Sequence, residues 1–205
     1  MSMTEGTSVS YDFTADWFSK HIPMWSALVP LLPGHRKFLE VGSFEGRSAV
    51  WLLENMIEED GQLFCIDTWQ GSPEFHVLPE DSVKGSFKRF QHNIALARGP
   101  KQRVHINNNR SIHALAGLMD DHADTFDFAY IDGSHMASDV LSDACLTFGL
   151  MKLGGIMVFD DYLWDLREDV LNRPKMAIDA FTSMFNRKIR LMGFGEQLII
   201  KKVNA

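Results

Sequence analysis

Cysteine and long apolar runs are both scarce in this chain of 205 residues. No apolar run approaches the roughly 20 residues that a membrane helix needs, and the polar start lacks the basic and apolar regions of a signal peptide. We therefore expect no membrane partner and a cytoplasmic location. The two cysteines, Cys65 and Cys145, stand in apolar surroundings without metal-ligand spacing. We expect both to be buried, reduced thiols.

Positive charge is also in short supply. The chain carries 20 Lys and Arg against 27 Asp and Glu, a formal net charge of -7. A nucleic-acid substrate would need a local basic patch against this average. The basic clusters at 84–89 and 187–190 are short and are interpreted as solvated faces. We therefore expect no nucleic-acid partner.

The composition fits one globular domain, with 45% hydrophobic and 23% charged residues. Short apolar runs alternate with segments of helical period, which is typical of a parallel sheet flanked by helices. The predicted fold class is α/β, a doubly wound and mostly parallel seven-stranded sheet that ends in an antiparallel hairpin. The expected strands are 37–41, 63–66, 103–106, 126–131, 156–159, 189–192 and 198–202.

Helices are predicted between these strands. One is expected over 47–56, and a short helical segment over 16–32 is expected to pack on the sheet or over its open end. We interpret residues 1–36 as an N-terminal helical segment of the substrate cap and 37–205 as the main domain. Core-facing stripes of helical period are formed by Val83, Phe87, Phe90 and Ile94, and by Val140, Ala144, Phe148 and Met151. Near the end, Met176, Ala180, Met184 and Phe185 indicate a last helix.

A glycine-containing turn follows the first strand. Gly42 and Gly46 flank Ser43, Phe44 and Glu45, and a helix begins directly afterwards. Such a turn lets the backbone approach a ligand beside the free N–H groups of a helix start. The spacing Gly-x-x-x-Gly differs from the Gly-x-Gly-x-x-Gly of dinucleotide binders. The acid Glu40 would repel a pyrophosphate but suits an ammonium group; a plain strand-to-helix turn is the alternative.

Acids and amides follow the next strands. Asp67 ends the second strand, about where α/β folds place an acid on ribose hydroxyls, although a helix cap looks similar. The polar run 108–111 after the third strand either contacts an adenine edge or caps the next helix. Asp132 ends the fourth strand, and Asp160 and Asp161 end the fifth. Carboxylates that converge in one crevice favour a divalent cation such as Mg²⁺, unless some of them are helix caps.

His135 lies three residues beyond Asp132. A histidine is mostly neutral near pH 7 and can take a proton, particularly from a hydroxyl that a metal has made more acidic. We therefore interpret His135 as the candidate general base. The other seven histidines remain unassigned.

In this order, the turn 40–46, Asp67 and the terminal hairpin resemble class I S-adenosylmethionine-dependent methyltransferases over roughly residues 38–203. The segments 131–135 and 159–161 are similar to the metal-dependent small-molecule O-methyltransferases, which include the catechol and the macrocin-type sugar enzymes. The resemblance implies a Rossmann-like methyltransferase fold and cofactor contacts for main-domain residues. These contacts are expected from Glu40, Gly42, Ser43, Gly46, Asp67, Thr68, Arg110, Ser111 and Asp132.

The same resemblance implies Mg²⁺ or another divalent cation held by Asp132, Asp160 and Asp161, with His135 as the catalytic base. His135 stands where the catechol enzymes have a lysine, which favours a sugar or other aliphatic hydroxyl as the acceptor. Asp161 replaces their asparagine and adds negative charge. The loop 69–81 and the segment 17–25 are expected to close over the acceptor, with plain surface packing as the alternative. Exposed tryptophans near the N-terminus are consistent with a homodimer.

Three other functions compete with this one. A nicotinamide-dependent oxidoreductase would need Gly-x-Gly-x-x-Gly and no carboxylate trio, the opposite of what the sequence contains. Metal-independent methyl transfer, including transfer to RNA, and a catalytically silent nucleoside-binding scaffold keep the same fold. The acid and histidine pattern argues against the scaffold, and the fold by itself does not name the acceptor.

Overall fold

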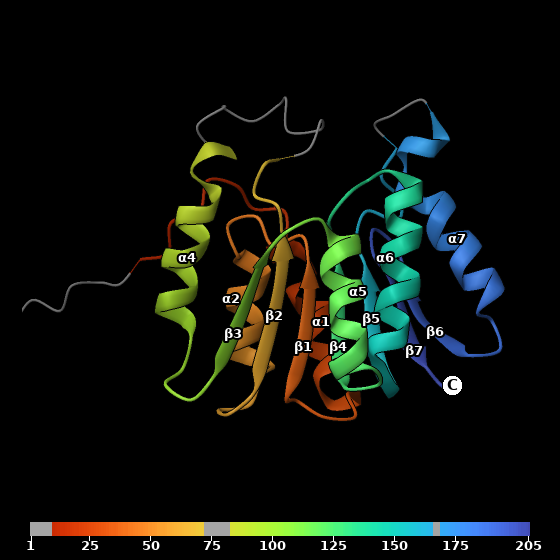
Figure 1. The fold of residues 1–205 in the computed structure, drawn as a ribbon, viewed down its shortest axis with the longest axis horizontal. Helices are drawn as coiled ribbons and strands as arrows, with labels where there is room; N and C mark the ends of the chain where they lie inside the picture. The colour runs from red at the N-terminus through yellow and green to blue at the C-terminus, as the bar shows by residue number, and fades with distance from the viewer. Residues whose placement is uncertain (1–9, 72–82, 166–168) are drawn as a thin grey trace, which may run out of the picture.

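A computed structural model describes residues 10–71, 83–165 and 169–205. One seven-stranded sheet has the order β3-β2-β1-β4-β5-β7-β6. The strands from β3 to β5 are parallel, whereas β7 runs antiparallel to both β5 and β6 (Figure 1). The predicted fold class is confirmed. The strands are β1 (Lys37–Val41), β2 (Gln62–Asp67), β3 (Arg103–Asn108), β4 (Phe126–Ile131), β5 (Met151–Phe159), β6 (Ile189–Phe194) and β7 (Leu198–Lys202).

Helices cover both faces of the sheet. Side chains alternate along each strand, so each strand contributes residues to a core on either face. Phe38 and Phe128 point to one face, where they pack with α1 (Ile22–Leu28), α2 (Arg47–Asn55) and α4 (Ser86–Ala97). The next residues along the same strands point to the opposite core. That second core lies under α5 (Ser111–His122), α6 (Ala137–Leu150) and α7 (Pro174–Met184).

The N-terminal segment forms the expected short helices, α1 with the single turns η1 (Ser19–His21) and η2 (Val29–Leu31) on either side. Trp25 of α1 is completely buried. Its ring packs edge-on against Tyr130 of the sheet with 4.8 Å between ring centroids, and its Nε1 donates a hydrogen bond of 2.8 Å to Gln197 Oε1. The segment is therefore fixed to the sheet, and its role as a substrate cap stays a prediction.

Some details of the sequence prediction are wrong. Cys145 is exposed, because it lies beside the buried stripe of α6 and not in it. The predicted last helix is confirmed as α7, in which Ala177, Ile178 and Phe181 face the core while Met176 and Met184 are exposed. The expectation of exposed tryptophans near the N-terminus is wrong for Trp25, which is buried. Met151 is buried as expected, but it begins β5 and does not extend α6.

No helix among the described residues has the length and apolar character needed to cross a membrane. Most of the predicted loop 69–81 lies outside the described residues, so its closure over an acceptor stays a prediction. Within its described part, Trp69 is buried against Phe90 with 5.0 Å between ring centroids.

Candidate functional site

The candidate site lies where the sheet changes winding direction. The chain leaves β1 toward β2 on one side, whereas β4 lies on the other side of β1. In open α/β sheets, ligands bind outside the carboxyl ends of the strands at such a switch point. Here the backbone N–H of Asp132 donates to the carbonyl of Val41 over 2.7 Å, which holds the two strand ends together.

The two glycines of the turn are required by its geometry. Gly42 has a φ of 86°, and a Cβ at this position would lie 1.9 Å from the carbonyl oxygen of Asp132. Gly46 has a φ of 81°, and its Cβ would lie 2.9 Å from the Phe90 ring. Both glycines therefore allow close packing of the turn, and contact with a cofactor stays a prediction.

Asp67 is bound to the same turn. One carboxylate oxygen accepts hydrogen bonds of 2.8 Å from the amides of Ser43 and Phe44, and the other accepts one of 2.7 Å from the amide of Trp69. Thr68, which follows, is half-buried and accepts from the amide of Gln70 over 3.3 Å. Carboxylate oxygens have further lone pairs, so these bonds leave room for a ribose hydroxyl.

Glu40 lies beneath the turn and is completely buried. Its two oxygens accept hydrogen bonds from the hydroxyls of Ser43 and Ser48 over 2.5 and 2.6 Å. Burial raises the pKa of Glu40 to about 7, and the two hydroxyls only partly offset this effect. Both carboxylate oxygens therefore have a hydroxyl donor, and contact with an ammonium group stays a prediction.

Arg110 and Ser111 stand at the start of α5, at the carboxyl end of β3. Arg110 is exposed, with its guanidinium 3.9 Å from the carboxylate of Asp139. The Asn109 side chain accepts a hydrogen bond of 2.8 Å from the amide of Arg110, the residue before the helix. No side chain among the described residues caps the start of α5, and the contact with adenine stays a prediction.

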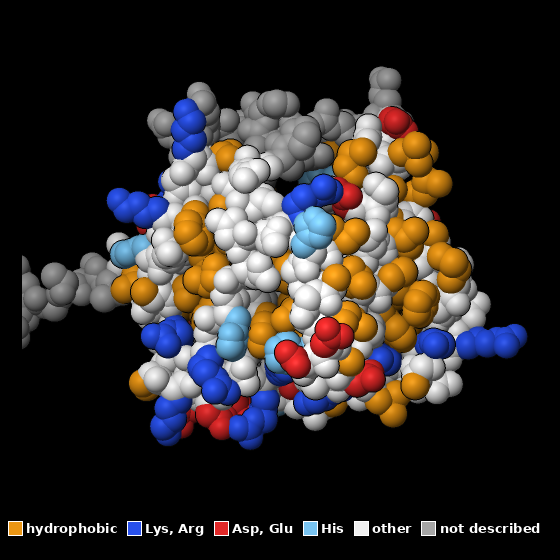
Figure 2. All heavy atoms as spheres, viewed as in Figure 1, with side chains coloured by type: hydrophobic (Ala, Val, Ile, Leu, Met, Phe, Trp, Pro, Cys, Tyr) orange, Lys and Arg blue, Asp and Glu red, His pale blue; other side chains and the backbone are white. Residues whose placement is uncertain are grey.

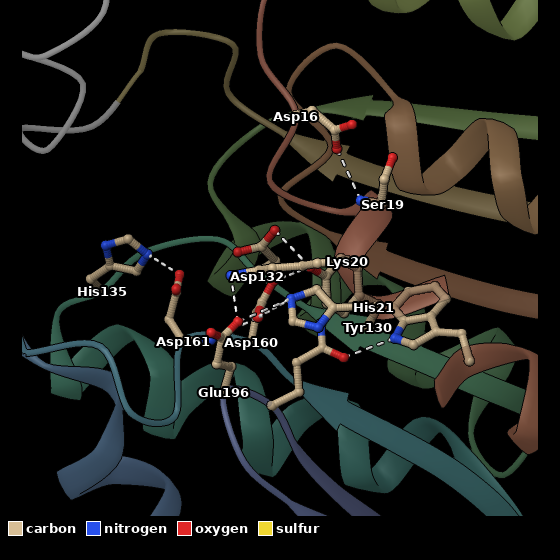
Figure 3. A network of polar contacts seen from close by, with 12 residues as sticks. Asp16, Ser19, Lys20, His21, Tyr130, Asp132, His135, Asp160, Asp161 and Glu196 are labelled. Carbon is tan, nitrogen blue, oxygen red and sulfur yellow. Dashed lines mark hydrogen bonds and ion pairs between the residues drawn. The ribbon is translucent and has the colours of Figure 1, made fainter. Parts of the chain in front are cut away.

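The predicted carboxylates converge beyond β4 and β5. The buried hydroxyl of Tyr130 lies 2.9 Å from Asp132 Oδ2 and also contacts Asp160 Oδ2 (Figure 3). A phenol has one hydrogen, so it can donate to only one of these carboxylates at a time. Burial and the neighbouring acids raise the pKa of Asp132 well above its usual range, and burial and Asp161 raise that of Asp160.

One group among the described residues has metal-ligand geometry. Asp132, His135 and Asp161 each offer one ligand atom, and these atoms all lie within 4.8 Å of one another. Asp160, the third predicted ligand, lies outside this group, and its role as a ligand stays a prediction. The carboxylate of Asp160 instead contacts Tyr130 and accepts a hydrogen bond of 2.9 Å from the amide of Asp161.

His135 is held from two sides. Its Nε2 lies 2.7 Å from Asp161 Oδ2, and its ring packs on Trp164 with 4.5 Å between centroids. The space enclosed here by β4, β5 and α7 is about 10 Å³, the size of one water molecule or ion. An acceptor molecule would therefore have to bind beside this space and not within it.

Sequence reasoning missed two residues at the acid cluster. Tyr130 reads as one more apolar member of a buried strand, although its phenol is a polar signal there. His21 lies in the N-terminal segment, 7% exposed, with its Nε2 3.8 Å from Asp160 Oδ1. Burial lowers its pKa, opposed by the charge of Asp160. No local pattern links His21 to the site, because only the docking of α1 brings it there (Figure 3).

Comparison with known proteins identifies the class of protein. A family model described as a methyltransferase domain matches residues 39–162, more than half of the chain. The matched region contains the glycine turn, Asp67, Asp132, His135 and the Asp160–Asp161 pair. Fold and family together define a protein with a methyltransferase domain. The chain belongs to this methyltransferase-domain family, and the resemblance found in the sequence is confirmed at that level.

Two solved structures show the same fold. The MycE methyltransferase of the mycinamycin biosynthetic pathway, in complex with Mg and SAH, has a TM-score of 0.58 and 16% identity over 93% of this chain and 51% of its own. An O-methyltransferase from Bacillus cereus, in complex with SAH, has a TM-score of 0.56 and 16% identity over 90% of both chains. These identities show a shared fold and do not identify a substrate.

A curated relative is closer in sequence. A probable caffeoyl-CoA O-methyltransferase of Arabidopsis thaliana is 26% identical over 160 residues, 75% of this chain and 61% of its own length. An uncharacterized protein of Acanthamoeba polyphaga mimivirus is 27% identical over 125 residues, 61% of this chain and 51% of its own. The chain thus spans between half and two thirds of these curated relatives.

Proposed function

We propose that the protein transfers the methyl group of S-adenosylmethionine to a hydroxyl of a small molecule, and that the reaction depends on a divalent cation. The observation that carries this proposal is the group Asp132, His135 and Asp161, whose ligand atoms lie within 4.8 Å of one another at the switch point of the sheet. The names of the similar proteins, which include O-methyltransferases and a complex with Mg and SAH, support it.

The cofactor would lie across the carboxyl ends of β1, β2 and β3. Asp67 would accept the ribose hydroxyls, since its fixed carboxylate has lone pairs to spare. Gly42, Ser43 and Gly46 would border the methionine part, and Glu40 would act on its ammonium group through Ser43. Thr68, Arg110 and Ser111 would border the adenine. The backbone of Asp132, bonded to that of β1, would close the pocket between the cofactor and the acid cluster.

The acid cluster suits a hard cation such as Mg²⁺. Burial, and then repulsion from the neighbouring carboxylates, raises the pKa of Asp132 and of Asp160. A cation between the carboxylates would remove this cost. Asp132 and Asp161 would hold it, with Asp160 turning toward it as the third ligand. When bound, such an ion orients an acceptor hydroxyl and makes it more acidic.

We assign His135 the role of general base. The acceptor oxygen attacks the sulfonium methyl carbon, the bond from that carbon to sulfur breaks, and S-adenosylhomocysteine leaves. The hydroxyl proton passes to a nitrogen of His135, and Asp161, 2.7 Å from Nε2, orients the ring and stabilises the imidazolium. Trp164 limits rotation of the same ring.

The first experiment is a calorimetric titration of Mg²⁺, with Mn²⁺ and Ca²⁺ beside it, into protein saturated with S-adenosylhomocysteine. We expect saturable binding to the native protein and none to the double variant Asp160→Ala, Asp161→Ala. Asp165→Asn, a change at an exposed acid near the cluster, should bind like the native protein. Binding of S-adenosylhomocysteine without binding of a metal would overturn the metal dependence. If neither S-adenosylhomocysteine nor a metal bound, the methyltransferase assignment would be overturned.

Two matched variants separate a base from a ligand. If His135 is the base, His135→Gln keeps the metal affinity and lowers methyl transfer by about 10²- to 10⁴-fold. Asp161→Asn should weaken metal binding as well as transfer. A large loss of metal affinity in His135→Gln would instead make the histidine a ligand, as the geometry also allows. Unchanged transfer by His135→Gln would disprove the base assignment.

A further inference from the structure

A hollow at the opposite end of the sheet gathers positive charge. It lies below the amino ends of the parallel strands, away from the candidate site, and encloses about 500 Å³. Figure 2 shows Lys and Arg side chains along this lower edge of the molecule, beneath β2 and β3. Five of the eight residues that line the hollow are cationic, on a chain whose net charge is -7: Arg36, Lys37, Lys101, Arg103 and Lys152.

Three of these cations are neutralised in place. Arg36 pairs with Asp60, and Lys101 pairs with Glu59 over 2.9 Å. Lys152 Nζ lies 2.7 Å from the buried carboxylate of Asp127. These pairs keep the cations fixed but leave N–H groups of each exposed to the hollow, because an ammonium or guanidinium has more donors than one carboxylate uses.

The other two cations form no ion pair with a carboxylate of the described residues. Lys37 Nζ lies 2.9 Å from His122 Nδ1 and 2.8 Å from Thr125 Oγ1, both uncharged acceptors. The Arg103 guanidinium makes no ion pair within the described part of the chain, and its side chain is exposed at the first position of β3. Burial and the nearby Lys152 lower the pKa of Lys37, a cost that a bound anion would remove.

We propose that this hollow binds a phosphorylated small molecule. Several cations converging on one space match a ligand with more than one negative charge, and the guanidinium fork of Arg103 matches the oxygens of a phosphoryl group. The volume of about 500 Å³ is that of an ordinary small-molecule site. The site is distinct from the methyl-transfer crevice, since it lies at the other end of the same strands.

Cations are also favourable near helix C-termini, and the helices of this sheet end on this side. The helix-dipole effect would account for one cation beside the C-terminus of each helix. It does not explain why side chains from three separate segments, at 36–37, 101–103 and 152, line one common hollow.

The test titrates inorganic tripolyphosphate, without metal ions and at low ionic strength, into the intact protein and four variants. We expect saturable binding with one site. Arg103→Glu and, independently, Lys101→Glu should weaken it by about tenfold or more, the loss of one strong charge-assisted contact. Arg190→Glu, the same charge change on the exposed edge strand β6, should change it by less than about twofold. Arg103→Gln should be intermediate.

Three results would overturn the proposal. Equal weakening by Arg190→Glu would mean that tripolyphosphate responds only to overall charge. Displacement of S-adenosylhomocysteine by tripolyphosphate would place the anion in the methyl-transfer crevice. Binding of a single-stranded RNA oligomer with a steep salt dependence, without binding of tripolyphosphate, would assign the cations to a nucleic-acid backbone.

Discussion

Gly42 shows how one residue determines the shape of the cofactor turn. Its left-handed backbone and its contact with the carbonyl of Asp132 exclude any side chain. Gly42→Ala should lower the free energy of unfolding by about 3 kcal/mol or more, because a Cβ 1.9 Å from a backbone oxygen forces the strand ends apart. Urea denaturation measures this loss.

Gly117→Ala is the matched control. Gly117 lies inside α5 with open space around it, so alanine should raise stability by about 1 kcal/mol through helix propensity. If both alanine variants shifted the denaturation midpoint in the same direction, the packing argument for Gly42 would fail.

Glu40 should give the protein a measurable dependence of stability on pH. The pKa of its carboxyl is about 7 in the folded protein, against 4.5 in the unfolded chain. Between these values the folded state keeps a proton that the unfolded state loses, so stability falls as pH rises and the loss is complete above pH 7. Glu40→Gln removes this contribution.

We therefore expect Glu40→Gln to gain stability relative to the native protein, by up to about 3 kcal/mol, as pH is raised from 4.5 to 8. The measurement is the difference in unfolding free energy of the cofactor-free proteins across this range. Asp160 contributes with the same sign in both proteins, so its effect cancels in the difference. The charge of Glu40 also raises the pKa of Asp132, so removing that charge adds a smaller change in the same direction. A pH-independent difference would contradict the buried acid.

At the scale of elements, α1 links the N-terminal segment to the acid cluster. Trp25→Ala should cost about 3–5 kcal/mol, because the ring fills a closed space between α1 and the sheet. Trp17→Ala is the control and should cost about 1 kcal/mol or less, since Trp17 is 49% exposed.

Hydrogen exchange locates the Trp25 effect. Amides of 19–31 should exchange faster in Trp25→Ala, as the segment opens locally, while β1 and β4 remain protected. Uniformly faster exchange would mean that α1 is an inseparable part of the core. His21 lies within this segment, so local opening in the variant should also separate His21 from Asp160.

At the scale of the whole molecule, ligands that bind only the folded chain should stabilise it. S-adenosylhomocysteine at one hundred times its dissociation constant should add about 2.7 kcal/mol, or about 5–10 °C in Tm. Asp67→Ala should abolish this shift, whereas Asp60→Ala, at an exposed acid on the opposite end of the strands, should keep it. A full shift in Asp67→Ala would remove Asp67 from the cofactor site.

The sequence by itself determined the architecture and the chemistry at the strand ends. Buried strands read as short apolar runs, so β1, β4 and the antiparallel β7 were predicted at their observed bounds. Acids that follow the parallel runs must gather at one edge of the sheet. Strand ends that extend into polar residues, such as Asn107 and Asn108 of β3, gave no apolar signal and were missed.

Only the tertiary structure decided which side chains meet. His21 reaches Asp160 across more than a hundred residues, His135 and not Asp160 completes the metal-ligand geometry, and Lys37, Arg103 and Lys152 share one hollow although no basic cluster was evident in the sequence. Local patterns report the period and burial of a segment. Contacts between segments depend on the order of the strands and on the docking of helices, which local pattern does not contain.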